Sequence, residues 1–185
     1  MAGWAALVYM AGYRCVACST DLDRTCPSFT CPHCRGNLDV VYDYKAAAAG
    51  LRGRFPAGND LFRYAALLPL DTPPDSFPLR VGQTPLYAAP ALAELVGLRD
   101  VYLKDDAMQP SASFKDRASA VAVARTRELG RKIVATASTG NAAAALAGQA
   151  AAAGQPAVIF VPKSAPQAKI AQLLVYGSTV PVSYT

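Results

Sequence analysis

Charged residues are scarce in this sequence, and those present are scattered. Only 17% of the 185 residues are charged and 52% are hydrophobic, so the chain can bury a core and is not disordered throughout. The net charge of +5 comes without a basic block or a basic–aromatic stripe, which argues against a nucleic-acid partner. The length fits one domain with a small appendage.

Long apolar runs are also missing. The apolar stretch at residues 1–12 is too short to cross a bilayer, and it lacks the basic segment that begins a secretory signal. Long-period repeats, the mark of solenoid folds, are absent from the sequence too. We therefore expect no membrane partner and a cytoplasmic protein.

Cysteine, in contrast, is well represented and patterned. Cys15 and Cys18 form one Cys-x-x-Cys pair, and Cys31 and Cys34 form a second one, with twelve residues between the two pairs. This is the spacing of a zinc ribbon, so we predict structural zinc bound by these four residues in a segment spanning residues 1–44. The segment has few apolar residues, and the metal would supply folding energy. Two disulfides are the alternative, which the lack of a secretory signal disfavours.

Two further candidate ligands, Cys26 and His33, lie near these pairs. We expect neither to bind the metal, because the paired cysteines already fill four tetrahedral positions. A zinc ribbon can also be a non-catalytic interaction module. That alternative would need a basic patch around the cysteines, where the sequence has only Arg14, Arg24 and Arg35.

The rest of the chain has the pattern of an α/β protein. Residues 45–88 are expected to form a connecting region, with short helices over 45–51 and 58–68. Strands then alternate with helices: strands are expected over 101–103, 131–137, 157–161 and 179–182, and helices over 91–96, 113–129, 142–153 and 166–176. This alternation predicts an α/β domain starting at residue 89, with a parallel sheet, helices on both faces and right-handed crossovers.

One lysine lies where a helix is expected to begin. Ser113 and Asp116 have the spacing of an N-terminal capping box, which places Lys115 in the first turn. Free N–H groups already make that end of a helix positive, so a cation is disfavoured there and a neutral amine is favoured. A Schiff-base lysine needs a neutral amine. The alternative is a solvated lysine that points away from the helix.

A second signal follows the strand expected at residues 131–137. Ser138-Thr139-Gly140-Asn141 is a small polar turn before an alanine-rich helix, the arrangement in which backbone N–H groups converge on an anion. In parallel sheets such sites lie beyond the carboxyl ends of the strands. The two signals therefore predict an amine and an anion site on successive units of one sheet. An ordinary helix cap is the alternative.

Several motifs together resemble the threonine synthase family, pyridoxal-phosphate enzymes of the tryptophan-synthase-β-like fold (fold type II). The main ones are Lys104-Asp105-Asp106, Gln109-Pro110-Ser111-Ala112-Ser113-Phe114-Lys115-Asp116-Arg117, Ala137-Ser138-Thr139-Gly140-Asn141-Ala142 and Lys169-Ile170-Ala171-Gln172. The chain departs from the family in two places. The family usually has Glu at the position of Asp106, and Asn-Pro-Thr-Gly at the positions of residues 109–112.

The resemblance implies a role for each matched residue. Lys115 would bind pyridoxal 5'-phosphate covalently and move protons, and Asn141 would hydrogen-bond the cofactor ring oxygen. The substrate carboxylate would be held by Ser138, Thr139 and Gly140. Phe114 would pack on the cofactor or in the core. Three residues are weaker candidates: Lys104, Asp116, which we expect to be a cap, and Arg117, which we expect to form an ion pair.

The reaction implied is conversion of O-phospho-L-homoserine and water to L-threonine and phosphate. The family's glycine-rich loop for the cofactor phosphate does not occur in these 185 residues. We therefore expect residues 89–185 to be the start of the cofactor domain and the chain to be inactive by itself. A sister enzyme of the same fold, such as cysteate synthase or threonine dehydratase, remains open. The expected partner is a phosphorylated amino acid, and a homodimer is compatible with the resemblance.

Overall fold

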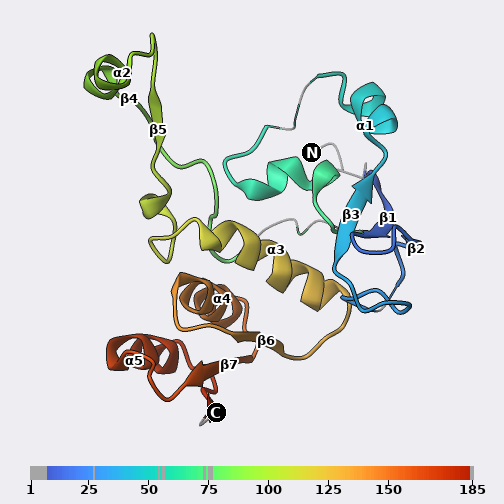
Figure 1. Cartoon of the computed structure of the whole chain (residues 1–185), viewed down its shortest axis with the longest axis vertical. Helices are drawn as coiled ribbons and strands as arrows, with labels where there is room; N and C mark the ends of the chain where they lie inside the picture. Colours follow the sequence, from blue (N-terminus) through green and yellow to red (C-terminus); the bar gives the residue numbers. More distant parts are fainter. Residues whose placement is uncertain are drawn as a thin grey trace. The chain divides into compact units, whose positions relative to one another are not determined.

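The computed structural model describes residues 8–26, 28–53, 55, 57–72, 74 and 77–183 (Figure 1). The chain divides into two compact units, here called unit 1 (Met1–Gly58 and Phe62–Pro74) and unit 2 (Asn59–Leu61 and Asp75–Thr185). The finer division at residues 44 and 88 stays a prediction. None of the helices within the described ranges is long and apolar enough to span a membrane.

Unit 1 is built on a small antiparallel sheet. Its strand order is β2 (Asp21–Asp23), β1 (Met10–Cys15), β3 (Leu38–Tyr42), with β1 in the centre. Helix α1 (Tyr44–Leu51) follows, and its first turn is capped by the Asp43 carboxylate, which accepts a 2.8 Å hydrogen bond from the Ala46 N–H. The cysteine pairs lie at the turns of this sheet, with Cys15 as the last residue of β1.

The helix expected over residues 58–68 is shorter and tighter than predicted. It is the 3₁₀ helix η1 (Leu61–Leu67), and the dihedral angles of Tyr64, φ −97° and ψ 16°, divide it. Short 3₁₀ runs are common as connectors because their hydrogen-bond geometry does not favour long helices.

Unit 2 contains the main core. Its elements are α3 (Lys115–Glu128), β6 (Val134–Ala137), α4 (Asn141–Ala152), β7 (Ala157–Pro162), α5 (Gln167–Val175) and β8 (Val182–Ser183). The three strands pair in parallel in the order β6–β7–β8, as the alternating pattern predicted. Ile159 and Val161 of β7 are buried against the alanine face of α4, together with Val123 of α3 and Leu173 of α5. The small alanine side chains let the helix pack closely on the sheet.

The opposite face of β7 is open. Alternate residues of a strand point to opposite faces, and Phe160, between the buried Ile159 and Val161, is 48% exposed. The paired residues of β6 on that face, Ala135 and Ala137, are exposed as well. Coverage of both faces by helices stays a prediction.

The strand expected at residues 101–103 does not join the parallel sheet. It is β5 (Tyr102–Lys104), which pairs antiparallel with β4 (Leu86–Ala88) in a separate two-stranded ladder. The only helix between them, α2 (Pro90–Val96), has seven residues and ends at Gly97 with φ 68°. The connection of about a dozen residues could serve either direction, and the pairing of Leu86 with Lys104 and of Ala88 with Tyr102 shows that the chain returns as a hairpin. The prediction of a single parallel sheet was therefore wrong for this strand.

Candidate functional site

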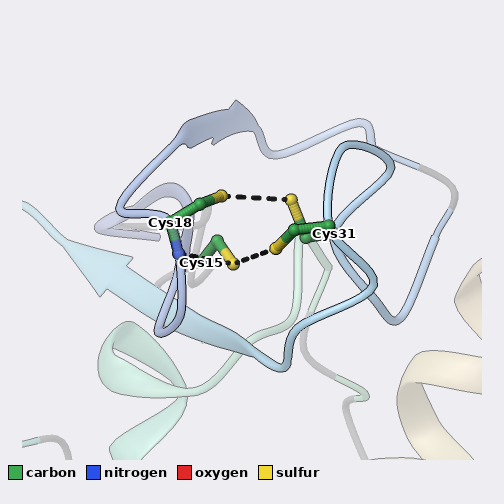
Figure 2. A group of neighbouring side chains, drawn as sticks. Cys15, Cys18 and Cys31 are labelled. Carbon is green, nitrogen blue, oxygen red and sulfur yellow. Dashed lines mark hydrogen bonds between the residues drawn. The ribbon is translucent and has the colours of Figure 1, made fainter.

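Four cysteine sulfurs meet in unit 1 (Figure 2). The Sγ atoms of Cys15, Cys18, Cys31 and Cys34 all lie within 4.8 Å of one another, with 3.4 Å between Cys15 and Cys34 and 3.7 Å between Cys18 and Cys31. A disulfide would require about 2.05 Å, and all four thiols are free, so the disulfide alternative is wrong. Four thiolates around a zinc ion at about 2.3 Å lie about 3.8 Å apart. The cluster has the size of a tetrahedral metal site.

The two cysteine turns share one backbone pattern. In each, the N–H of the first cysteine donates to the carbonyl five residues later, and its own carbonyl accepts from the N–H four residues later. Both bonds are 2.9 Å long in residues 15–20 and 2.8 Å in residues 31–36. The residue after each second cysteine is left-handed, with φ 60° at Ser19 and 61° at Arg35. The local backbone of each turn therefore orients its pair of thiols.

The thiols of this cluster influence each other's protonation. The Thr20 hydroxyl, 3.2 Å from the Cys18 sulfur, and the Thr20 N–H lower the pKa of Cys18 to about 6. The Gly36 N–H, 3.4 Å from the Cys34 sulfur, acts to lower the pKa of Cys34, but the neighbouring thiols prevail and raise it to about 12. A cation would relieve this repulsion between thiolates. Cys26 and His33 are not members of the cluster.

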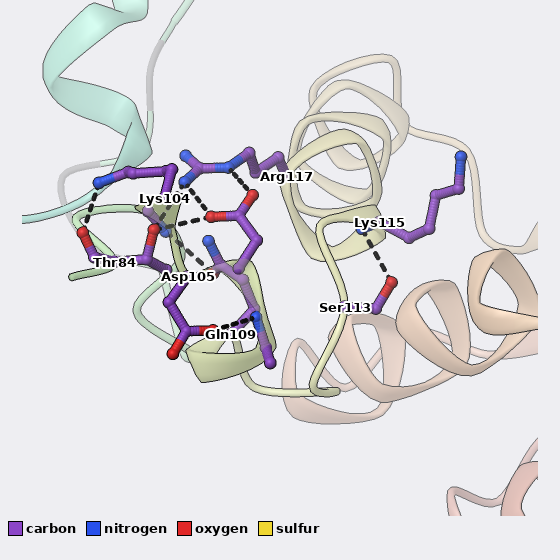
Figure 3. A network of polar contacts seen from close by, with 10 residues as sticks. Thr84, Lys104, Asp105, Gln109, Ser113, Lys115 and Arg117 are labelled. Atoms are coloured by element: carbon purple, nitrogen blue, oxygen red, sulfur yellow. Dashed lines mark hydrogen bonds and ion pairs between the residues drawn. The ribbon is translucent and has the colours of Figure 1, made fainter. Parts of the chain in front are cut away.

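In unit 2, Lys115 is the first residue of α3, as the sequence predicted. Its N–H donates to the Ser113 hydroxyl at 3.2 Å (Figure 3), and its Nζ lies 4.4 Å from the centre of the Phe114 ring. The side chain of Lys115 is half-buried, whereas Phe114 is 59% exposed. The alternative that Phe114 packs in the core is therefore wrong, and its ring is available beside the amine.

Asp116 differs from the capping box predicted for it. Its carboxylate accepts hydrogen bonds from the N–H of Ser111 at 2.8 Å, from the hydroxyl of Ser111 at 2.6 Å, and from the amide of Gln149 at 2.6 Å. Asp116 and Gln149 are both fully buried. The carboxylate reaches to α4 because a buried charge needs several donors. Sequence reasoning missed Gln149, whose only signal is a polar residue on an alanine-rich buried face.

Arg117 forms the ion pair expected of it. Its guanidinium donates to both carboxylate oxygens of Asp106, at 2.9 and 2.8 Å, and the Thr84 hydroxyl donates to the same carboxylate at 2.7 Å (Figure 3). These hydrogen bonds, that from Arg117 first, hold the pKa of Asp106 well below its usual range. The Lys104 amine donates to the Thr84 carbonyl. Lys104 therefore belongs to a network that connects β5 with the start of α3.

The turn before α4 has the predicted position and its own internal bonds. The Ser138 N–H donates to the Phe160 carbonyl of β7, and its hydroxyl accepts from the Gly140 N–H, both at 3.2 Å. Gly140 is the N-cap of α4 and has no neighbouring atom within 4 Å where a Cβ would lie, so the turn is open there. Thr139 is half-buried. Asn141 is the first residue of α4 and not its cap, and its exposed side chain accepts a 3.4 Å hydrogen bond from Lys169.

Sequence comparison defines the class of protein to which this geometry belongs. The pattern of the family described as pyridoxal-phosphate dependent enzymes matches residues 78–184, which include both the lysine turn and the turn before α4. The chain belongs to this family.

Its curated relatives are more specific. The chain is 39% identical to the threonine synthase of Methanosarcina acetivorans over 168 residues, which are 90% of this chain and 41% of that protein. It is 35% identical to the threonine synthase of Methanocaldococcus jannaschii over 173 residues, 90% of this chain and 42% of that protein. The resemblance predicted from the motifs is confirmed, and the chain spans about two fifths of the length of these relatives.

Solved structures agree at the level of the fold. Serine racemase from Dictyostelium discoideum superposes with a TM-score of 0.52 and 30% identity, over 55% of this chain and 33% of that one. Maize serine racemase superposes with a TM-score of 0.51 and 30% identity, over 56% of this chain and 32% of that one.

Proposed function

We propose that this chain supplies the lysine-bearing part of a threonine synthase, which converts O-phospho-L-homoserine and water to L-threonine and phosphate. The observation that carries the proposal is the position of Lys115: it begins α3 within the family's lysine motif, in a chain 39% identical to a threonine synthase over 90% of its length. The alternatives are other fold type II enzymes, such as cysteate synthase or threonine dehydratase.

The residues present fit pyridoxal 5'-phosphate. Lys115 offers a primary amine beside the exposed ring of Phe114. Asn141 offers an exposed side-chain amide, and the open turn at Gly140 leaves room for a ligand to approach the backbone. An amine for covalent attachment, an amide for a ring oxygen and backbone N–H groups for an anion are the donors that this cofactor and an amino-acid substrate require.

The residues of the chain would share the work as follows. The cofactor, when bound, supplies an electron sink that stabilises negative charge on the substrate carbons. Lys115 would hold the cofactor covalently, and its amine would move protons at Cα and Cβ of the substrate. The amide of Asn141 orients the cofactor ring. Ser138, Thr139 and the backbone of Gly140 bind the substrate carboxylate, and this fixes Cα next to the amine.

The test is a comparison of substrates in a polypeptide of the relatives' full length that contains this chain. Threonine and phosphate should form from O-phosphohomoserine. Formation of cysteate from phosphoserine and sulfite, or release of ammonia from threonine, at a higher kcat/KM would identify the enzyme as one of the sister enzymes instead.

We propose that the 185 residues by themselves are inactive, since they span about two fifths of the relatives. Threonine formation by the chain alone would contradict this.

We further propose that Cys15, Cys18, Cys31 and Cys34 bind one structural zinc ion. The mutual sulfur distances and the matched backbone of the two turns support this, and the donor set is the one zinc prefers. Free thiols also suit a reducing compartment, which supports a cytoplasmic location for the enzyme.

The net charge of +5 favours a phosphorylated substrate. Assembly as a homodimer is also part of the proposal.

A further inference from the structure

A fully buried carboxylate lies next to the site lysine and has no part in the chemistry proposed above. Asp116 accepts two hydrogen bonds from Ser111, on the segment before α3, and one from Gln149, on α4. The donor–acceptor distances are 2.6–2.8 Å, and both carboxylate oxygens accept, one from Ser111 and the other from Gln149. Asp116 therefore joins two segments of unit 2 that are distant in the sequence.

The first of these segments has an unusual backbone. Ala112 has φ 54°, in the left-handed region that favours glycine. The N–H of Ala112 donates to the Gln109 carbonyl at 2.8 Å, and Ser111 on its other side is held twice by Asp116. Asp116 is thus one of the groups that hold the turn before Lys115, in which Ala112 has a conformation that alanine does not adopt readily.

The second segment is α4. Gln149 is fully buried, and its Oε1 atom has no hydrogen-bond partner among the described residues, so the bond from its Nε2 atom to Asp116 is the interaction that compensates its burial. Gln149 lies about two turns after Asn141, or about 12 Å along the helix axis. Because a packed helix moves as a rigid body, a contact at Gln149 also fixes the position of Asn141 in the first turn.

We propose that Asp116 is a positioning residue, which clamps the turn at Ala112 to α4 and so sets the Lys115 amine relative to Asn141. The inference rests on the proposed function for the roles of Lys115 and Asn141, whereas the clamp itself rests only on the contacts. Two variants separate these parts. Asp116→Asn replaces the carboxylate by a neutral amide, and Gln149→Leu removes the hydrogen bond to α4 by placing an apolar side chain of similar size at the buried position. Asp100→Asn, at an exposed carboxylate paired with its neighbour Arg99, is the matched control.

The first measurement is amide hydrogen exchange in the chain, with the Ser111 N–H compared with the core N–H of Ile159. Asp116→Asn should raise the relative exchange rate of Ser111 about five-fold, because a neutral amide oxygen accepts more weakly than a carboxylate. Gln149→Leu should raise it by a smaller factor, although Gln149 does not touch Ser111. Adding Ala112→Gly to Asp116→Asn should restore part of the protection. An unchanged Ser111 rate in Gln149→Leu would overturn the clamp.

The second measurement uses pyridoxal 5'-phosphate as the probe in a polypeptide of the relatives' full length that contains this chain, with the cofactor fixed to amines by borohydride and located by peptide mapping in the folded fraction. Both variants should lower the share of label on Lys115, relative to Lys104, Lys163 and Lys169, at least about five-fold, and Asp100→Asn should leave it unchanged. A share that stays constant while the exchange of Ser111 rises would make Asp116 merely structural and overturn the positioning role. If the parent full-length polypeptide shows no preference for Lys115, the proposed function fails, and the exchange data alone decide the clamp.

Discussion

The cysteine cluster of unit 1 and the lysine turn of unit 2 are built in opposite ways. In the cluster, each pair of ligands is oriented by hydrogen bonds within its own six-residue turn, and the two turns repeat one pattern. The lysine turn depends on distant residues: Asp116 bonds to Gln149, and Arg117 bonds to Asp106. A site assembled from local turns can be inferred from spacing alone, whereas a site held by long-range contacts needs the fold or a family motif.

The largest effect is expected from breaking the cluster. Replacement of a buried ligand, Cys31→Ser, should abolish binding of close to one zinc per chain and unfold unit 1, since structural zinc contributes about 10–16 kcal/mol in small zinc domains. Metal analysis and circular dichroism measure both effects. Cys26→Ser is the control and should leave the metal content unchanged. A fully folded Cys31→Ser variant without metal would show that the cluster is not a folding element.

Metal binding should also weaken as the pH falls. Zinc requires thiolates, and the neighbouring thiols raise the pKa of Cys34 to about 12 in the metal-free cluster, so protons must leave when the metal enters. The apparent zinc affinity should therefore decrease from pH 8 to pH 6, as measured by competition with a chromophoric chelator. An affinity independent of pH over this range would contradict proton release.

The next largest effect is expected at Lys115. In a full-length polypeptide containing this chain, Lys115→Ala should lower threonine formation by at least about 100-fold, because the group that attaches the cofactor and transfers protons is lost. The variant should remain folded, since alanine is the best helix former. Lys132→Ala, at an exposed lysine, is the control. Borohydride labelling of Lys104, Lys163 or Lys169, with the Lys115 variant still active, would place the site elsewhere.

A smaller loss is expected at the start of α4. Asn141→Ala should change the absorption of the bound cofactor and reduce activity by about 1.5–3 kcal/mol in transition-state stabilisation, the usual cost of losing a hydrogen bond to a charged group. The fold should persist, because Asn141 is exposed and is not the cap of α4. Spectra and rates identical to those of the parent enzyme would leave Asn141 without a role in the site.

The smallest effect concerns the network behind the lysine turn. The pKa of Asp106 is lowered in the folded state, so its pair with Arg117 stabilises unit 2 above about pH 4 and loses this contribution as the pH falls below that value. Asp106→Asn should cost about 1 kcal/mol at pH 7, since the pair is partly exposed, and should flatten the acid limb of the unfolding curve. Chemical denaturation at pH 7 and pH 3 measures both. An equal loss at the two pH values would exclude the ion pair as the cause.

Much of unit 2 could be predicted from the sequence. The helices at 113–129 and 142–153 and the strand at 157–161 were placed to within a few residues, because alternating apolar segments and glycine stops determine them locally. The position of β5 could be predicted to within one residue, but its antiparallel pairing could not, since pairing direction depends on how the chain returns after α2. The role of Asp116 was also missed: its spacing to Ser113 suggested a cap, and its partner Gln149 is 33 residues away.

The arm formed by β4, α2 and β5 has a consequence for handling the protein. Leu95, Tyr102 and Leu103 are between 50% and 82% exposed, and β4 and β5 form a ladder with only two strands. A hydrophobic ladder of this kind offers unpaired backbone groups and an apolar surface to any neighbour in solution. Purified samples of the chain should therefore tend to aggregate. Turbidity should rise with protein concentration and with added sulfate, and it should fall when mild detergent covers the arm.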